Sequence, residues 1–389
     1  MKHKPKVFRI SSVPESLYEL LEGQLKYLNK YYEVIGISSD GEFLNKTSNR
    51  EKIETYTVPI RRRISPFFDI ISITKMFIIM RQENPTIVHS ITPKAGFISM
   101  VASFLARVPI RIHTFTGLIF PTENGLKKYL LIFVDKIICK LATNIIPEGK
   151  GVRNDLISHK ITKKNIKVLH NGHVNGINID RFKKSNQIVK QGELIKTNYG
   201  IASSEFIFCF VGRLVGDKGI NELVQAFDKL LKNHKKIKLL LIGIYEPDLD
   251  PLRDDTMELI RETPSIIEVG YQDDVRPFLS ISNIFVLPSF REGFPGAVMQ
   301  AGAMGLPSIV TNINGCNEII IDQINGLVIP PGNTKSLRNA MEYFITNPDK
   351  TAEYSNNARK LIVDRYDQKI IFRTVKKKYD LLLNEKGLI

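Results

Sequence analysis

The sequence predicts an α/β protein made of two doubly wound domains, each with a parallel sheet between layers of helices. Short apolar runs alternate with helical periodicity along the chain, and this alternation restarts near residue 206. The length of 389 residues also exceeds what one hydrophobic core normally organises. A polar, lysine-rich segment at 175–204 separates the halves, so we place an N-terminal domain at 1–185 and a C-terminal domain at 186–367.

Each domain is expected to hold six strands. Those of the first domain are predicted at 7–10, 33–38, 87–90, 110–115, 143–146 and 166–169. Those of the second are predicted at 206–212, 239–243, 266–269, 284–287, 308–311 and 326–329. Helices are predicted at 16–29, 70–80, 94–106, 220–233, 296–304 and 335–346. A last, strongly basic helix at 368–384 makes the segment 368–389 a candidate to pack back on the first domain.

Composition narrows the function classes. Hydrophobic residues make up 43% and charged residues 24%, an ordinary globular balance. The three cysteines lie far apart in apolar surroundings, which indicates buried thiols rather than disulfides or a metal site. No apolar run approaches the ~20 residues of a membrane span. The net charge of +15 suits a phosphorylated substrate or an anionic membrane surface. It also suits nucleic acid, which we rank last because no nucleic-acid-binding motif is present.

The first chemical motif is FVGRLVGDKG at 210–219. A predicted strand ends at Gly212, a glycine-bearing loop carries Arg213 and Lys218, and a helix opens after the loop. Arg offers a planar fork and Lys a point charge, two complementary ways to hold phosphate. Cations fixed at this place would stabilise the charge of a departing diphosphate. On spacing alone, a solvated loop with two surface cations is an equal alternative.

The second motif is SFREGFPGAVMQAGAMGLP at 289–307. Pro295 suits the first turn of a helix, whose backbone amides could then meet phosphate or sugar oxygens. Glu292 could accept hydrogen bonds from sugar hydroxyls, and Gln300 is within reach of the same side. A partner for the helix dipole is the alternative role of Glu292.

Together these motifs resemble glycosyltransferase family 4, the retaining, nucleotide-sugar-dependent transferases of the GT-B fold. In that fold two Rossmann-like domains face a cleft. The resemblance implies that Arg213 and Lys218, next to Gly212, hold the donor diphosphate. It also implies that Glu292 and the backbone of Phe294, Pro295, Gly296 and Ala297 contact the transferred sugar. The turns at 314–318 and 325–327, and Asn171-Gly172, are similar to family turns as well.

Two positions depart from the family pattern. Gln300 stands where the family usually has a second Glu that holds the donor ribose, and it can still form hydrogen bonds. Thr116 stands where a His usually precedes Gly117, while His113 lies three residues earlier. Residues 113 and 116 of an extended strand point to opposite faces, so His113 replaces the usual His only if the strand has already turned. A core or surface role for His113 is at least as plausible.

The resemblance assigns the acceptor to the N-terminal domain. Ser12, at the end of the first strand, is a candidate to contact it, and Ser16 is expected to cap the following helix. The basic run 61–63, followed by Phe67 and Phe68, suits an interfacial membrane contact. If the two phenylalanines are core residues, the basic run is a solvated face.

We therefore expect a retaining, metal-independent hexosyltransferase with catalytic Arg213, Lys218 and Glu292 and no cofactor. The nucleotide sugar, a uridine one by resemblance, is a co-substrate, and a glycan or polyprenyl-diphosphate-linked sugar of bacterial polysaccharide biosynthesis is the acceptor. The expected location is cytoplasmic, with peripheral attachment to the inner membrane face. The alternatives are a non-catalytic nucleotide-sugar-binding relative, another enzyme of the fold such as an epimerase, and a basic nucleic-acid binder.

Overall fold

The computed structural model describes residues 4–61, 65–248 and 250–389 and contains two compact units. Unit 1 comprises Met1–Gly176 together with Gln368–Ile389, and unit 2 comprises Ile177–Asp367. The sequence placed the border at 185/186, too late in the chain. Ile177 already belongs to unit 2, because its backbone N–H donates to the carbonyl of Tyr366 at 2.8 Å and Phe182 packs into the core of that unit.

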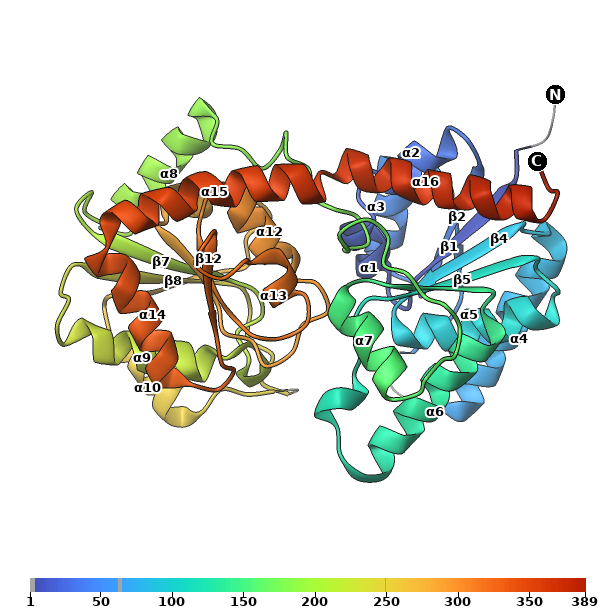
Figure 1. Ribbon diagram of the computed structural model, residues 1–389, viewed down its shortest axis with the longest axis horizontal. Coiled ribbons are helices and arrows are strands. Elements are labelled where there is room, and N and C mark those ends of the chain that lie inside the picture. The colour runs from blue at the N-terminus through green and yellow to red at the C-terminus, as the bar shows by residue number, and fades with distance from the viewer. Residues whose placement is uncertain (1–3, 62–64, 249) are drawn as a thin grey trace. The chain divides into compact units, whose positions relative to one another are not determined.

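Unit 1 has a six-stranded parallel sheet in the order β3-β2-β1-β4-β5-β6 (Figure 1). Its strands are β1 (Lys6–Ile10), β2 (Glu33–Ser38), β3 (Glu54–Thr57), β4 (Ile87–Ile91), β5 (Ile110–Phe115) and β6 (Asn144–Pro147). Its helices are α1 (Pro14–Leu20), α2 (Gln24–Asn29), α3 (Glu42–Glu51), α4 (Pro66–Glu83), α5 (Pro93–Leu105), α6 (Gly125–Leu141), α7 (Lys150–Ser158) and α16 (Gln368–Glu385), with a 3₁₀ turn η1 (Phe120–Thr122).

Helices cover both faces of this sheet, so its central strands are apolar on both sides. Val7 and Phe8, neighbours on β1, enter two different hydrophobic cores. One core is closed by α4, α5, α6 and α7, the other by α1, α2, α3 and α16. The C-terminal helix α16 thus completes the face of the sheet next to α2, as the sequence had allowed (Figure 1).

Unit 2 repeats the architecture, with strand order β12-β11-β10-β7-β8-β9. Its strands are β7 (Phe206–Val211), β8 (Ile237–Ile242), β9 (Ile266–Gly270), β10 (Ile284–Leu287), β11 (Ser308–Thr311) and β12 (Gly326–Ile329). Its helices are α8 (Asn186–Asn198), α9 (Ile220–Leu231), α10 (Asp254–Glu262), α11 (Arg276–Ile281), α12 (Gly296–Ala303), α13 (Cys316–Ile319), α14 (Thr334–Thr346) and α15 (Pro348–Tyr366), with a 3₁₀ turn η2 (Gly216–Lys218).

Four local features of unit 1 differ from the prediction. The segment 166–169 is a loop, because Ile166 packs on one core and Leu169 on the other, so the chain passes between the two faces at this point. Strand β3 was missed, since its residues are polar and half-buried at a sheet edge. The helix predicted at 16–29 is two helices separated at Gly23, whose φ of +76° interrupts the helical path. The first of them begins at Pro14, so Ser16 is not its cap.

The buried carboxyl of Asp135 on α6 gives a pH-dependent test of the packing in unit 1. Burial raises the pKa of this carboxyl to about 7. Between its unfolded pKa near 4 and its folded pKa, the folded chain binds one more proton than the unfolded chain, so stability falls as pH rises. We expect Asp135→Asn to stabilise the protein by about 1–4 kcal/mol at pH 8, with the gain vanishing towards pH 4.

Thermal unfolding at a series of pH values checks this, with the exposed Asp248→Asn as control. A gain that does not depend on pH would show that the Asp135 carboxyl does not titrate as its burial requires.

Candidate active site

The first motif forms a sharp loop between a strand and a helix in unit 2. Strand β7 ends at Val211, the chain turns at Gly212 with φ +153°, and η2 leads to Gly219 with φ +72° at the start of α9. A side chain at Gly219 would overlap the carbonyl oxygen of Pro288. Glycine is therefore required there for its left-handed backbone and for close contact with the loop after β10.

This contact lies at the topological switch point of the sheet. Strand β7 has β8, the next strand in the chain, on one side and β10 on the other. The loops that follow β7 and β10 therefore lead away in opposite directions and leave a crevice between them. Among the contacts that join the two loops, the N–H of Phe290 donates to the carbonyl of Asp217 at 2.9 Å, and Nη2 of Arg291 donates to the Asp217 carboxylate at 2.7 Å. Open α/β sheets bind ligands at such places.

Lys218 and Glu292, one from each loop, form an ion pair in this crevice. The Lys218 Nζ lies 2.5 Å from Oε1 of Glu292, and the Ser289 hydroxyl donates to the same oxygen at 2.8 Å. The side chains are only 17% and 11% exposed, so solvent screens the pair weakly. Burial and the Glu292 carboxylate raise the pKa of the nearby Cys316 thiol well above its usual range, which leaves this cysteine protonated.

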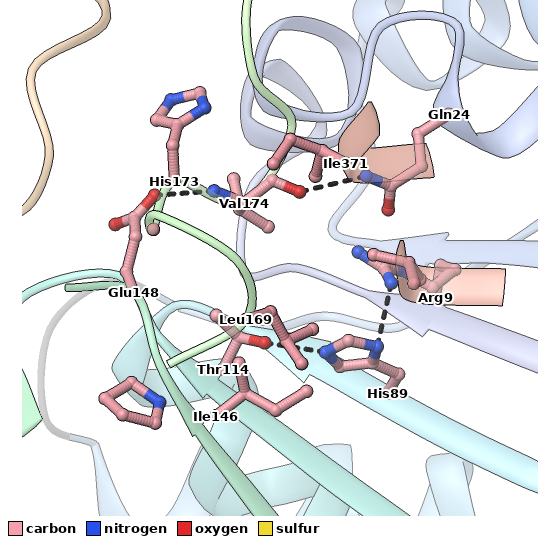
Figure 2. Close-up of a pocket in the computed structure, with 13 residues that line it drawn as sticks. Arg9, Gln24, His89, Thr114, Ile146, Glu148, Leu169, His173, Val174 and Ile371 are labelled. Atoms are coloured by element: carbon pink, nitrogen blue, oxygen red, sulfur yellow. Dashed lines mark hydrogen bonds between the residues drawn. The ribbon is translucent and has the colours of Figure 1, made fainter. Parts of the chain in front are cut away.

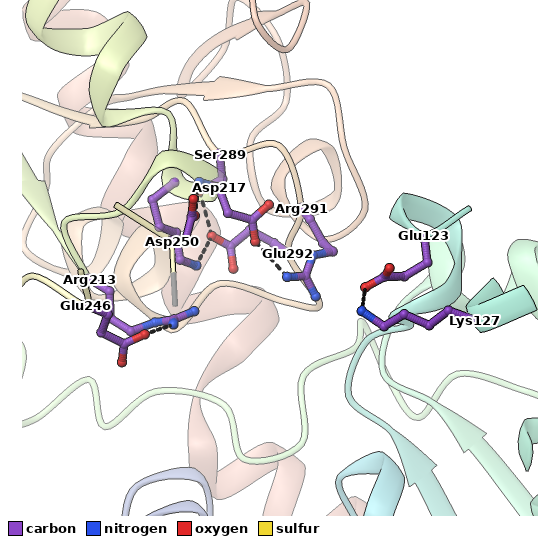
Figure 3. Close-up of polar contacts among 10 residues, drawn as sticks. Glu123, Lys127, Arg213, Asp217, Glu246, Asp250, Ser289, Arg291 and Glu292 are labelled. Carbon is purple, nitrogen blue, oxygen red and sulfur yellow. Dashed lines mark hydrogen bonds and ion pairs between the residues drawn. The ribbon is translucent and has the colours of Figure 1, made fainter. Parts of the chain in front are cut away.

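Arg213 forms the second ion pair, with a residue that sequence reasoning missed. Its Nη1 lies 2.5 Å from Oε2 of Glu246, on the loop after β8, and its side chain is 46% exposed. The same loop supplies Asp250, whose carboxylate accepts from the N–H of Asp217 at 2.6 Å. Figure 3 shows these carboxylates gathered around the loop of Arg213. An acidic run directly after a parallel strand was the signal that could have revealed them.

The second motif can present its backbone to a ligand, but not the aromatic side chain of Phe294. Phe294 is buried and meets the ring of Tyr366 edge-on at 5.5 Å, so its side chain is a core residue. Pro295 caps α12 instead of lying inside its first turn, and Gly296 and Ala297 form that turn. Gln300 lies further along α12 and is half-buried.

In unit 1, Ser12 and Thr92 meet at the equivalent switch point between β1 and β4. Their hydroxyl oxygens are 2.6 Å apart, and the Ser12 hydroxyl accepts from the N–H of Ala95 at 3.1 Å. Ser12 is buried and fixes the start of α5. Its position at the carboxyl edge of the sheet matches the prediction, while its contacts are structural.

His113 is a core residue, the alternative that its position in the strand left open. It is fully buried on β5, its Nδ1 is 2.9 Å from the Ser90 hydroxyl, and burial lowers its pKa to about 3. A side chain on Gly96 would overlap the His113 ring, so the two residues are packed closely. Thr116 follows the strand and is half-buried, and Asn171 lies in the loop before Gly172 with its amide 3.1 Å from the ring of His170.

A buried polar cluster in unit 1 was also missed by sequence reasoning. Arg9 on β1 is fully buried, and its Nη1 lies 2.8 Å from Nδ1 of His89 (Figure 2). The same Nη1 donates to the Tyr379 hydroxyl at 2.8 Å. Burial and the Arg9 charge lower the pKa of His89 well below its usual range. The adjoining cavity, about 20 Å³, has room for one water-sized group. The cluster therefore ties α16 to the sheet, and the cavity beside it is too small to bind a sugar.

Within the residues that the structure describes, no group of three His, Cys, Asp or Glu side chains is arranged to hold a metal ion. Among the same residues, none of the helices has the length and apolar character needed to cross a bilayer.

Family models match both units. Residues 16–173 match the model described as Glycosyltransferase Family 4, and residues 192–361 match the model described as Glycosyl transferases group 1. With two doubly wound units and cations at the switch point of the second, the chain is a glycosyltransferase of the GT-B class.

Named relatives are similar over most of the chain. The capsular polysaccharide biosynthesis glycosyltransferase CapM of Staphylococcus aureus is 31% identical over 382 residues, 98% of this chain and 98% of CapM. The UDP-Gal:alpha-D-GlcNAc-diphosphoundecaprenol alpha-1,3-galactosyltransferase of Escherichia coli is 26% identical, over 86% of this chain and 84% of that enzyme. A crystal structure of Anabaena HepE in complex with UDP aligns with TM-score 0.79 and 18% identity, over 97% and 99% of the chains. The chain belongs to glycosyltransferase family 4.

The Arg213–Glu246 pair generates a prediction about ligand affinity. A diphosphate that binds Arg213 must compete with the Glu246 carboxylate, and an exposed ion pair of this kind contributes about 0.2–1 kcal/mol. We expect Glu246→Gln to tighten binding of a nucleoside diphosphate by about 1.5- to 5-fold in calorimetry.

The matched control is Glu205→Gln, which removes the same charge from an ion pair with Lys238. That pair lies at the amino ends of β7 and β8, away from the loops of the site. Weaker binding by Glu246→Gln would mean that Glu246 positions Arg213 for the ligand instead of competing with it.

Proposed function

We propose that this glycosyltransferase transfers a hexose or N-acetylhexosamine from a UDP-sugar to a lipid-linked glycan acceptor in bacterial polysaccharide biosynthesis. The observation that carries the proposal is the placement of Arg213 and Lys218 at the switch point of unit 2. The UDP complex of the similarly folded HepE and the UDP-Gal donor in the name of the Escherichia coli relative support a uridine nucleotide.

The leaving group carries the chemistry that these cations serve. As the bond between the anomeric carbon and the diphosphate oxygen breaks, negative charge grows on the departing UDP. Arg213 can form a bidentate contact with the phosphates, and Lys218 adds a point charge in a place shielded from water. Cations fixed before the reaction stabilise this charge without reorganisation, which lowers the barrier. These two residues take the place that a metal ion could otherwise fill, so we propose that transfer proceeds without a metal or other cofactor.

Glu292 and the backbone before α12 are proposed to position the sugar. The Ser289 hydroxyl and Lys218 already hold the Glu292 carboxylate in one orientation. A carboxylate oriented in this way can accept hydrogen bonds from sugar hydroxyls, while the first turn of α12 can donate backbone N–H groups. We propose that the acceptor hydroxyl attacks from the face on which the diphosphate leaves and gives its proton to the departing diphosphate oxygen, so that the anomeric configuration is retained.

The acceptor is proposed to be a sugar linked to a polyprenyl diphosphate at the inner face of the cytoplasmic membrane. The Escherichia coli relative is named for a diphosphoundecaprenol-linked acceptor, and CapM for capsular polysaccharide biosynthesis. A net charge of +15 favours approach to a diphosphate and to an anionic membrane.

Removing either cation tests the proposed role directly. A charge-assisted hydrogen bond contributes about 1.5–3 kcal/mol, so Arg213→Ala and Lys218→Ala should each lower kcat/KM by about 10- to 150-fold. UDP-sugar turnover with a polyprenyl-diphosphate sugar checks this, and NMR of the product reports the anomer. The control is Lys238→Ala, which removes a cation at the amino end of β8 and should retain normal turnover.

Normal turnover in both Arg213→Ala and Lys218→Ala would contradict the proposal. Tight UDP binding without transfer to any acceptor would instead favour a non-catalytic relative, the alternative that Gln300 and Thr116 raise.

A further inference from the structure

Helix α6 of unit 1 carries an apolar stripe on its outer face. Leu126, Tyr129, Leu130 and Phe133 follow the i, i+3, i+4, i+7 spacing that places residues on one side of a helix. Their exposed fractions are 89%, 71%, 44% and 60%. The inner side of the helix is already packed, since Ile138 and Cys139 are buried in the core. The outer stripe is therefore additional apolar surface that the fold of unit 1 does not use.

Helix α4 carries a second stripe of the same kind. Phe67, Ile70, Ile71 and Ile78 are 71%, 63%, 41% and 48% exposed, whereas Met76 and Met80 on the inner side are buried. Isolated exposed apolar residues are normal on proteins, but two helices with repeating exposed stripes indicate an interaction surface.

The stripes lie on the same side of unit 1 and near the same edge of its sheet. Helix α5 contacts both α4 and α6, and the three helices close one hydrophobic core (Figure 1). Both α4 and α6 lead into the next strand of a parallel sheet, so each begins at the carboxyl edge of that sheet. Most of the exposed apolar residues occupy the first half of their helix, towards the edge that holds Ser12 and Thr92.

The charges around the stripes are basic. Lys75 on α4 and Lys127, Lys128 and Lys136 on α6 are exposed or half-exposed, and the guanidinium of Arg61 lies 3.2 Å from the ring centre of Phe68. The acidic residues of the two helices do not offset these charges. Asp135 is buried, and Asp69 is buried and bonded to Lys94 at 2.6 Å. Glu83, the last residue of α4, is paired with Lys6 at 2.6 Å. The Glu123 carboxylate neutralises Lys127, whose Nζ lies 2.6 Å away. The other lysines keep the net charge around the stripes positive. The rest of the predicted basic run, residues 62 and 63, lies outside the described residues.

We propose that the stripes of α4 and α6 form a docking surface for an anionic lipid bilayer. Apolar and aromatic side chains would enter the interface between headgroups and acyl chains while the lysines meet anionic headgroups, the pattern of helices that lie in a membrane surface. Charge complementarity favours a membrane over a second copy of this chain, because two identical basic surfaces repel each other. The inference rests on the proposed lipid-linked acceptor and adds that the bilayer meets unit 1 near the strand ends assigned to that acceptor.

Binding to vesicles of phosphatidylcholine with phosphatidylglycerol tests the surface without any donor or acceptor. The triple variant Leu126→Ser, Leu130→Ser, Phe133→Ser should lower the partition coefficient by about tenfold or more, because three large apolar side chains no longer enter the lipid. Its unfolding temperature should remain that of the parent, since the replaced side chains are exposed. The matched control, Val189→Ser, Leu194→Ser, Tyr199→Ser, removes exposed apolar residues from unit 2 and should bind as the parent does.

The absence of tryptophan from the sequence permits a direct probe of insertion. Phe133→Trp introduces a single tryptophan on the stripe of α6, and its emission should shift to the blue and be quenched by brominated lipids on vesicle addition. Leu194→Trp, equally exposed in unit 2, should show neither change.

Three results would overturn the inference: no binding to anionic vesicles, equal loss in the control variant, or dimerisation through the stripes in place of vesicle binding. None of them affects UDP binding, which is measured separately by thermal shift. If the parent protein binds vesicles but does not bind UDP, the result would contradict the proposed function and still support the docking surface.

Discussion

The site depends on placing two cations in one crevice without leaving their charges unbalanced. Lys218 and Arg213 lie on the loop after β7, and carboxylates from two different neighbouring loops neutralise them. A buried ammonium without a partner would destabilise the fold, so Glu292 permits Lys218 to be 17% exposed before any ligand arrives. The topology makes this possible, because the loops after β8 and β10 flank that of β7 only at the switch point of the sheet.

The two units place different side chains at the same switch point. In unit 2 Gly219 allows the loop around η2 to pack against Pro288, and this loop carries the cations Arg213 and Lys218. In unit 1 the equivalent place holds the small hydroxyl residues Ser12 and Thr92, which bond each other and fix α5. Cations suit a diphosphate, and neutral hydroxyl residues suit an uncharged acceptor. The proposed division between donor and acceptor would therefore follow from side chains placed on one shared backbone plan.

Much of the fold could be predicted from sequence because buried parallel strands are short apolar runs, which is why β7 and β10 were found. Polar β3 could not be found, since its edge position requires no apolar side chains. Arg213, Lys218 and Glu292 were identified by motif, whereas Glu246 and Arg9 were missed. Their partners lie far away in the sequence: Arg9 meets Tyr379 through the return of the C-terminal helix, which local periodicity cannot reveal.

A crystal structure of the protein with UDP tests the central claim most directly. The account predicts diphosphate oxygens within hydrogen-bonding distance, about 3 Å, of both the Arg213 guanidinium and Lys218 Nζ, with the Arg213–Glu246 pair opened. A diphosphate bound elsewhere, with both ion pairs of the crevice intact, would contradict it.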